Sequence, residues 1–376
     1  MASQLEQHLP LLQQLIQTQS YSGQEHAAQA LIMRQFEQLN LQPEWQGSNV
    51  VLKLAGMDKG RAFVFNSHTD VVGVDNPGSW KNNPFSGTIE DGRVHGRGAA
   101  DMKGGLWASM MTAYQLSKRT DLPHDAYFTY VTEEETSGAG TKSFVDWLQN
   151  QQERADYGEI AAIFTEPTGL TTAHHGHRGN FFIQAEIKGQ GGHSSRPDLV
   201  HPHAIVQMNQ LITELSGLSA AWQSEFAEGE FMPPTITPTA ISASSTSPNK
   251  VARVCTAVFD LRTVPNFHSE AYEIVAQRAK ALGIEMSLVC PAAPVGYTSR
   301  GANIVKAMQE VISDLRVEPF DAAADLGFMS EIGAEGVIFG PGEMEQAHQT
   351  DEWAPLDQVL KAPDLYTQIY DAWAEL

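Results

Sequence analysis

The chain has 376 residues, of which 42% are hydrophobic, enough for two domains with a large buried core. Its formal net charge of −21 argues against nucleic-acid binding, because phosphate contacts need a basic surface. No apolar run approaches the roughly 20 residues of a membrane span, and the N-terminal residues indicate an amphipathic helix rather than a signal peptide. The two cysteines, Cys255 and Cys290, form no CxxC pair, so we expect free thiols and a cytoplasmic protein.

The first and last parts of the chain alternate helical and strand patterns. Residues 1–177 carry apolar runs separated by stretches with helical spacing, and the same texture returns over 293–376. Helices alternating with buried strands are typical of a mostly parallel sheet covered on both faces. We therefore expect these two parts to form one α/β domain with a mixed, mostly parallel sheet flanked by helices. Its predicted helices span 25–39, 102–118, 141–149, 303–315 and 357–376.

Residues 178–292 have a different order of elements. Strand, helix, strand, strand, helix and strand patterns follow one another, which is the ferredoxin-like βαββαβ arrangement. We expect a small domain inserted between the two parts of the larger one. The stretch 242–247, rich in serine and threonine, is predicted to be the hairpin loop between the two central strands. In chain order, the predicted elements are 181–188, 202–218, 235–243, 251–263, 269–282 and 284–290.

Four predicted strands of the larger domain end close to a histidine or a carboxylate. In open α/β sheets, ligands bind outside the carboxyl ends of the strands. Imidazole and carboxylate groups delivered there are typical metal ligands, so four such strand ends indicate a metal site. The strands and the residues that follow them are 61–67 before His68, 126–132 before Glu133–Glu135, 161–165 before Glu166, and 336–339 shortly before His348.

The candidate ligands fit a pair of divalent cations by charge. Three carboxylates and one hydroxide balance the four positive charges of two Zn²⁺ ions, so the cluster avoids a large desolvation penalty. One carboxylate must bridge the ions, and Asp101 is the natural candidate because it lies in the glycine-rich loop 96–101. Asp70, two residues after His68, is expected to orient that imidazole through its other ring nitrogen. The predicted ligand set is His68, Asp101, Glu135, Glu166 and His348.

Seven short motifs occur along the chain: SHTD at 67–70, GRGAADMKGG at 96–105, EEETS at 133–137, TEPT at 165–168, GQGGHSS at 189–195, DLR at 260–262 and GPGEMEQAHQTDE at 340–352. In this order and spacing they resemble the dizinc amidohydrolase family, which includes acetylornithine deacetylase, succinyl-diaminopimelate desuccinylase, aminoacylase and glutamate carboxypeptidases. The resemblance covers about residues 10–370. It implies a catalytic domain with an inserted dimerisation lid, and therefore a homodimer.

The resemblance also implies which residue binds which metal ion. It places His68 and Glu166 on one zinc. It places Glu135 and His348 on the other, with Asp101 as the bridge. The implied cofactors are two Zn²⁺ per subunit, for which Co²⁺ or Mn²⁺ can substitute.

The expected chemistry is attack of a metal-bridging hydroxide on an amide carbonyl. Zinc lowers the pKa of bound water towards ~7. A carboxylate must then carry the remaining proton to the leaving amine. Glu134, next to the ligand Glu135, occupies the position of the family's general base, whereas Glu133 is expected to be structural.

Polar residues of the inserted domain are expected to contact the substrate. By resemblance, His193 stabilises the oxyanion, in its own subunit or in the neighbouring one. Arg262 and Asn249 match family positions that contact the substrate carboxylate, and Arg suits bidentate binding of that group. Arg178, beside a group of histidines near the domain boundary, is a further candidate for substrate contact.

The substrate is expected to be a small N-acyl-L-amino acid. The ending 340–352 and the GHSS run look more like acetylornithine deacetylase than like the desuccinylase. A desuccinylase-like D-G-R-F pattern appears here as Asp325–Phe328 without its arginine, so one candidate cation for a succinyl carboxylate is missing. We therefore expect a zinc-dependent deacylase of amino-acid biosynthesis. A desuccinylase, and a dipeptidase or carboxypeptidase of the same family, stay open as alternatives.

Two interpretations lie outside this class of enzyme. A catalytically silent, metal-binding scaffold would not need Glu134 in addition to all five ligand residues. A serine hydrolase would need a GxSxG turn, which the sequence lacks. Loss of activity with a chelator, and its return with Zn²⁺ or Co²⁺, separates both from the metal-dependent hydrolase.

Overall fold

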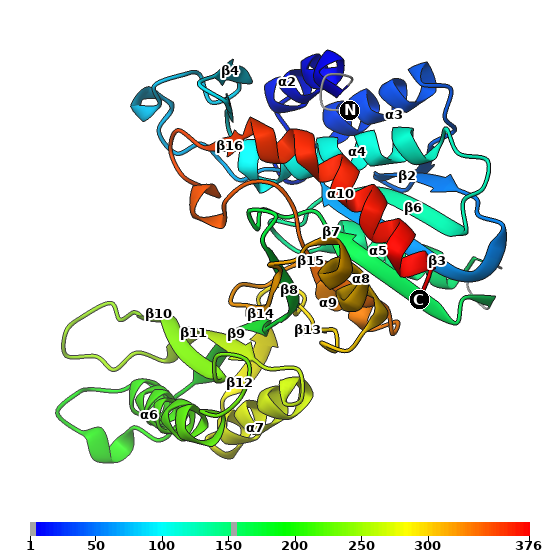
Figure 1. Ribbon diagram of the computed structural model, residues 1–376. Helices are drawn as coiled ribbons and strands as arrows, with labels where there is room; N and C mark the ends of the chain where they lie inside the picture. The colour runs from blue at the N-terminus through cyan, green and yellow to red at the C-terminus, as the bar shows by residue number, and fades with distance from the viewer. Residues whose placement is uncertain (1–4, 152–155) are drawn as a thin grey trace. The chain divides into compact units, whose positions relative to one another are not determined.

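The computed structural model describes residues 5–151 and 156–376, which form two compact units (Figure 1). Unit 1 comprises Met1–Gly176, Gly296–Pro319 and Ala324–Leu376, apart from the residues outside those ranges. Unit 2 comprises His177–Val295 and Phe320–Ala323. None of the described helices has the length and apolar character needed to cross a membrane.

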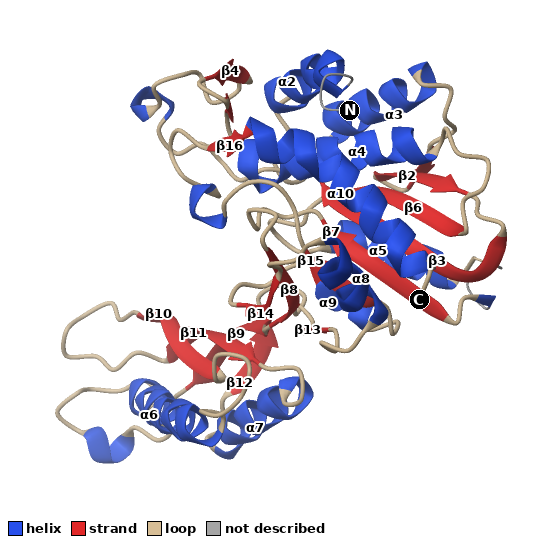
Figure 2. Cartoon of the chain, in the orientation of Figure 1, coloured by secondary structure: helices blue, strands red, loops and turns tan. Residues whose placement is uncertain are grey.

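A mixed sheet of nine strands runs through unit 1, and its central strands are parallel (Figure 2). The neighbouring strands β6 (His124–Val131), β3 (Asp58–His68), β7 (Glu159–Phe164) and β15 (Glu335–Ile338) run in one direction. Their carboxyl ends therefore meet at one edge of the sheet. The outer strands are β1 (Glu44–Gln46), β2 (Asn49–Leu54), β8 (Thr172–His177), β13 (Gly296–Tyr297) and β14 (Arg316–Phe320).

Helices cover both faces of this sheet. Side chains alternate between the two faces along each strand, so buried side chains on either face need helices to pack against. Phe65 of β3 packs on Tyr366 of α10, with the ring centroids 5.7 Å apart. Tyr127 of β6 points to the opposite face and contacts Phe144 of α5. The predicted α/β class is therefore confirmed. The helices of unit 1 are α2 (Leu9–Gln17), α3 (His26–Gln38), α4 (Gly104–Leu116), α5 (Ala139–Gln149), α8 (Asn303–Val311), α9 (Leu326–Ser330) and α10 (Leu356–Ala374).

The segment before α4 is not a regular helix. The sequence predicts a helix from residue 102, but Asp101 and Met102 have non-helical backbone angles, so α4 begins at Gly104. At Gly105 the helix approaches the end of β7 so closely that a Cβ atom would lie 1.9 Å from the Thr165 carbonyl oxygen. A glycine is therefore required there, and it brings the loop of Asp101 next to the strand end that leads to Glu166.

A small sheet connects two segments that are far apart in the sequence. Strand β16 (Trp353–Pro355) pairs with β5 (Arg93–His95), which pairs with β4 (Thr88–Glu90). The Gly96 N–H donates to the Glu352 carbonyl oxygen at 2.9 Å, immediately beyond the paired strands. The end of the GPGEMEQAHQTDE motif is thereby placed beside the glycine-rich loop.

Unit 2 has the predicted βαββαβ order. Its four strands form an antiparallel sheet in the order β10-β11-β9-β12. Helix α6 was predicted to end at residue 218 but continues to Glu225, because Trp222 is buried and packs edge-on against Phe267. The elements are β9 (Gly179–Lys188), α6 (Ala204–Glu225), β10 (Thr235–Ala243), β11 (Val254–Thr263), α7 (His268–Ala281) and β12 (Glu285–Leu288).

Candidate metal centre

The five side chains predicted to be metal ligands lie near the edge of the sheet where the parallel strands of unit 1 end. His68 is the last residue of β3, and Glu166 follows the end of β7. Glu135 lies in the turn after β6, and His348 lies in the loop after β15. Asp101 comes from the loop before α4. The residues predicted as ligands are thus drawn from five separate segments of one unit.

Their atoms form two groups that share Asp101. His68 Nε2 lies 3.1 Å from Asp101 Oδ1 and 3.5 Å from Glu166 Oε1. His348 Nε2 lies 3.3 Å from Asp101 Oδ2 and 3.0 Å from Glu135 Oε2. Each oxygen of the shared carboxylate therefore faces a different imidazole–carboxylate pair.

These separations fit a pair of divalent cations. Ligand atoms about 2.0–2.2 Å from a tetrahedral Zn²⁺ lie roughly 3.3–3.6 Å from one another. The four separations above span 3.0–3.5 Å, close to that range. Ligand atoms of His68, Asp101 and Glu135 also lie within 4.8 Å of one another. Imidazole nitrogens and carboxylate oxygens are suitable donors for zinc, so the residues present fit the metal pair that the sequence predicts.

The charge balance at the cluster also favours cations. Burial raises the pKa of Glu166 to about 8. Hydrogen bonds to Asp101 and then Glu135 raise the pKa of His348 to about 10. Besides burial, the charge of Asp101 raises the pKa of both Glu166 and Glu135, so the carboxyls disfavour one another's ionisation and a bound cation would relieve this repulsion.

Glu134, the predicted general base, lies in the turn between β6 and α5. Burial, followed by the charge of Asp325, raises its pKa well above the usual range. Its carboxyl also interacts with the charges of His68 and Glu166, so it belongs to the same cluster. The preceding residue, Glu133, has φ +60°, a left-handed conformation that is uncommon for residues other than glycine.

Asp70 connects His68, the first predicted ligand, to the turn that carries Glu134. The Nδ1 atom of His68 lies 3.0 Å from the Asp70 carbonyl oxygen and 3.4 Å from its Oδ1, so Nε2 is left to face Asp101. The two carboxylate oxygens of Asp70 accept hydrogen bonds from the backbone N–H groups of Glu134 and Glu135, at 3.2 and 3.1 Å. The sequence predicted the contact with His68 but not the support of the turn.

Unit 2 brings its predicted substrate-binding residues together in two places. The Nε2 atom of His193 lies 3.3 Å from Asn249 Nδ2, and both residues are exposed. Elsewhere in the unit, Arg262 donates through Nε and Nη2 to the carboxylate of Asp260, at 2.9–3.1 Å. Burial and then the nearby Arg262 lower the pKa of Arg178, whose guanidinium contacts carbonyl oxygens. The two arginines are therefore close enough to repel each other.

Sequence patterns missed two buried carboxylates near the candidate metal centre. Asp325, the residue before α9, accepts a hydrogen bond from the Thr141 hydroxyl at 2.5 Å. Glu352, which is 1% exposed, accepts hydrogen bonds from the loop of Asp101. Glu352 ends the GPGEMEQAHQTDE motif, and that position was the only signal available for it.

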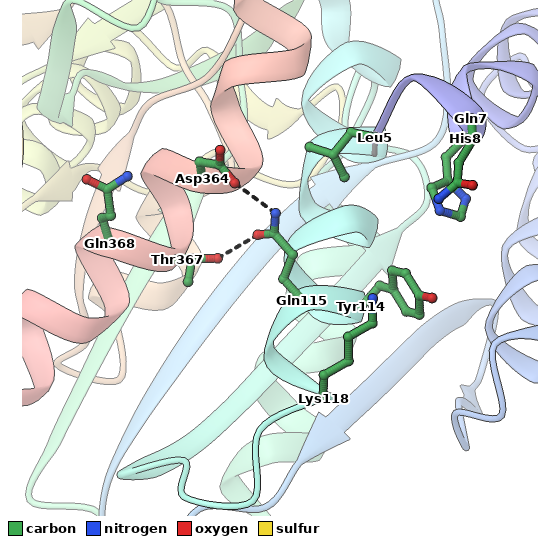
Figure 3. A pocket seen from close by; sticks show the side chains of 9 residues that line it. All are labelled: Leu5, Gln7, His8, Tyr114, Gln115, Lys118, Asp364, Thr367 and Gln368. Atoms are coloured by element: carbon green, nitrogen blue, oxygen red, sulfur yellow. Dashed lines mark hydrogen bonds between the residues drawn. The ribbon is translucent and has the colours of Figure 1, made fainter. Parts of the chain in front are cut away.

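A pocket of about 430 Å³ in unit 1 has none of the predicted ligands in its lining (Figure 3). Its lining residue Gln115 donates to Asp364 and accepts from Thr367, so these polar groups satisfy one another. Lys118 lies 3.7 Å from the centroid of the Tyr114 ring. The pocket is therefore separate from the metal centre.

Comparison with known proteins identifies the family. The chain matches peptidase family M20/M25/M40 over residues 64–372. It is 28% identical to the succinyl-diaminopimelate desuccinylase of Magnetococcus marinus, over 96% of this chain and 97% of that protein. It is 30% identical to the acetylornithine deacetylase of Pectobacterium carotovorum subsp. carotovorum, over 84% of this chain and 82% of that protein.

The fold is shared with solved structures of the same family. One is the YXEP protein of Bacillus subtilis, a dinuclear metal binding peptidase, with a TM-score of 0.72 and 16% identity. The match covers 98% of each chain, so it includes both units. The family match over most of the sequence and this common fold agree, and the chain belongs to peptidase family M20/M25/M40, a family of metal-dependent peptidases and amidohydrolases.

Proposed function

We propose that this enzyme hydrolyses the amide bond of a small N-acyl-L-amino acid, in the manner of an acetylornithine deacetylase. The observation that carries the proposal is the sharing of Asp101 between two imidazole–carboxylate pairs, with Glu134 beside them. We propose Zn²⁺ at both positions, with Co²⁺ or Mn²⁺ as substitutes. When bound, the cations supply two effects: they lower the pKa of a water molecule and polarise the amide carbonyl.

The protein's own side chains transfer the proton of the attacking water and hold the transferring group in place. Glu134 is the proposed general base, which takes a proton from the attacking water and delivers it to the leaving amine. Asp70 keeps this base in a fixed position relative to the ligand Glu135, since both backbone N–H groups donate to its carboxylate. His193 is proposed to stabilise the oxyanion from the inserted domain, residues 178–292.

The proposed contacts for the substrate carboxylate are Arg178, Arg262 and Asn249. Asp260 occupies the Nε–Nη2 side of the Arg262 guanidinium, so Nη1 is the nitrogen that can approach a ligand. Within the described parts of the chain, Arg178 has no carboxylate at ion-pair distance. The charges of Asp321 and Asp260 both act on Arg178, so the proposal rests on the N–H donors that the two neighbouring guanidinium groups offer to a substrate carboxylate and not on an excess of positive charge.

The alternatives are a desuccinylase and a peptidase of the same family. A succinyl group carries a second carboxylate that needs a cation of its own. In this chain the segment Asp325–Phe328 offers no arginine, and all four of its residues are buried. The desuccinylase relative in Magnetococcus marinus keeps that alternative open.

Side-by-side kinetics test the substrate class. With Zn²⁺ or Co²⁺, we expect kcat/KM for N-acetyl-L-ornithine to exceed that for N-succinyl-diaminopimelate by at least about tenfold, because leaving a charged group without a partner costs more than ~1.4 kcal/mol. An unblocked dipeptide is the third substrate in the comparison. A preference for the succinyl compound or for the dipeptide would overturn the deacetylase proposal but would leave the metal-dependent hydrolase in place.

We also propose a homodimer formed through residues 178–292. Strand β10 lies at the edge of the unit 2 sheet, and its residues after Ile236 are exposed on both faces. Ile241, in this stretch, has a side chain that is 58% exposed. An exposed edge strand is a ready site for pairing across a two-fold axis.

Mixing two inactive variants tests both the dimer and the placement of His193. If His193 acts on the neighbouring subunit, coexpression of His193→Ala and Glu134→Gln chains creates one intact site in each mixed dimer. Random pairing then restores about a quarter of the wild-type activity. Mixed dimers without any recovered activity would place His193 in its own subunit. A fully active monomer, measured by light scattering, would reject the dimer.

A further inference from the structure

Glu352 is a buried carboxylate that holds the backbone of the loop carrying Asp101. Its side chain is 1% exposed. Oε1 accepts hydrogen bonds from the N–H groups of Ala100, at 2.9 Å, and Asp101, at 3.2 Å. Oε2 accepts from the Gly98 N–H at 3.1 Å and from Arg97 Nη1 at 2.6 Å. Each oxygen is therefore used twice, and all four donors belong to the same loop.

Arg97 connects this carboxylate to the loop of His348. Its Nη1 also donates to the Gln349 carbonyl oxygen at 3.3 Å, and its Nη2 donates to the His348 carbonyl oxygen at 3.2 Å. The Arg97 side chain is 5% exposed, so the guanidinium is fixed in a buried position between the two loops. One ion pair thus joins the backbone of the shared ligand to the backbone of a second ligand.

We propose that Glu352 and Arg97 are positioning residues that set the spacing of the two metal sites. The proposal rests on the proposed function, because it takes Asp101 and His348 as ligands. Distances in a metal site hold within about 0.2 Å, so a small displacement of a ligand backbone lowers affinity. A displacement of Asp101 affects both sites because both share its carboxylate. A displacement of His348 affects only one.

Substitution of Glu352 by Gln keeps the shape of the side chain but removes its charge and one of its two acceptor oxygens. An amide keeps the shape of the carboxylate but presents only one oxygen. Its NH₂ group must then face either the N–H groups of Ala100 and Asp101 or the donors of Gly98 and Arg97. Either orientation places donors against donors, so the loop must move. Arg97→Lys makes a narrower change, since an ammonium group cannot span both carbonyl oxygens of the His348 loop in place of the guanidinium.

Metal binding by the full-length, metal-free protein tests the proposal. The protein is titrated with Co²⁺, binding is followed by absorption and calorimetry, and Tm is measured without metal. We expect Glu352→Gln to lower the affinity for both ions by roughly 10–100-fold, the usual effect of losing a residue that supports a ligand. We expect Arg97→Lys to lower mainly the affinity for the ion that Glu135 and His348 are proposed to hold. Glu345→Gln, which removes the same charge from an exposed residue of this segment, should bind both ions like the wild type.

The outcomes separate positioning from a purely structural role. If Glu352→Gln and Arg97→Lys lower Tm but bind Co²⁺ with wild-type affinity, the positioning proposal is wrong and the proposed function stands. If the wild type itself binds no metal, the proposed function fails first. Should Glu352→Gln not fold, the titration of Arg97→Lys decides. An equal loss of affinity for both ions, or no loss of affinity for either, would overturn the proposal.

Discussion

Glu134→Gln is expected to keep its two metal ions and its fold but to lose at least ~10²–10⁴-fold in kcat, the usual contribution of a positioned proton-transfer group. The amide has the shape of the carboxyl but cannot accept the proton of the attacking water. The backbone N–H of residue 134 still donates to Asp70, so the turn is maintained. Steady-state kinetics with N-acetyl-L-ornithine, together with metal analysis of the same sample, measure the effect.

The neighbouring residue provides a matched control. Glu133→Gln removes the same charge one position earlier, from a partly exposed side chain whose contact is a long 3.5 Å hydrogen bond from Ser137. We expect this variant to retain activity within a few-fold of the wild type. A metal-loaded Glu134→Gln enzyme with near-normal kcat would exclude Glu134 as the base.

Asp101→Ala is expected to abolish binding of both metal ions, and activity with it. The physical reason is that each oxygen of Asp101 faces a different histidine, so neither site keeps its full ligand set. His348→Ala is the matched comparison, because it removes a ligand from one site only and should reduce the metal content by one ion. Elemental analysis gives the stoichiometry of each protein.

Thermal unfolding gives a second measurement for the same variants. An ion that binds only the folded protein stabilises it by RT ln(1 + [L]/Kd), so Zn²⁺ should raise the Tm of the wild type. We expect no such increase for Asp101→Ala and a smaller one for His348→Ala. An Asp101→Ala protein with full metal content and a normal increase in Tm would contradict the bridging assignment.

Long periodic segments made most of the fold predictable. The runs that became β3, β6, β7 and β15 each contain consecutive apolar residues, and their parallel pairing agrees with the mostly parallel sheet expected from alternating helices and strands. The short strands β4, β5 and β16 could not be predicted, because three residues show no period and their pairing depends on a distant segment. Helix α6 passes Gly217 because the burial of Trp222 outweighs the local cost of a glycine.

The residue types of the candidate site were predictable from the sequence, but the residues that hold the predicted ligands and base in place were not. Histidines and carboxylates at strand ends indicated a metal pair, and the motifs indicated which residues to combine. Sequence could not show that Asp70 accepts hydrogen bonds from the turn of Glu134, since residues in separate strands acquire such contacts only in the folded sheet. The link between Arg97 and Glu352 was hidden for the same reason: 2.6 Å separates their atoms, but most of the chain lies between them.

Adding metal back to the metal-free enzyme tests the central claim most directly. The ions are removed with a chelator, Zn²⁺ or Co²⁺ is returned in steps, and bound metal per chain is measured alongside hydrolysis of N-acetyl-L-ornithine. We expect no hydrolysis without metal, two ions bound per chain at saturation, and activity that rises as the sites fill. Full hydrolysis by the metal-free protein, or saturation at a single ion that Asp101→Ala still binds, would contradict a two-metal amidohydrolase bridged by Asp101.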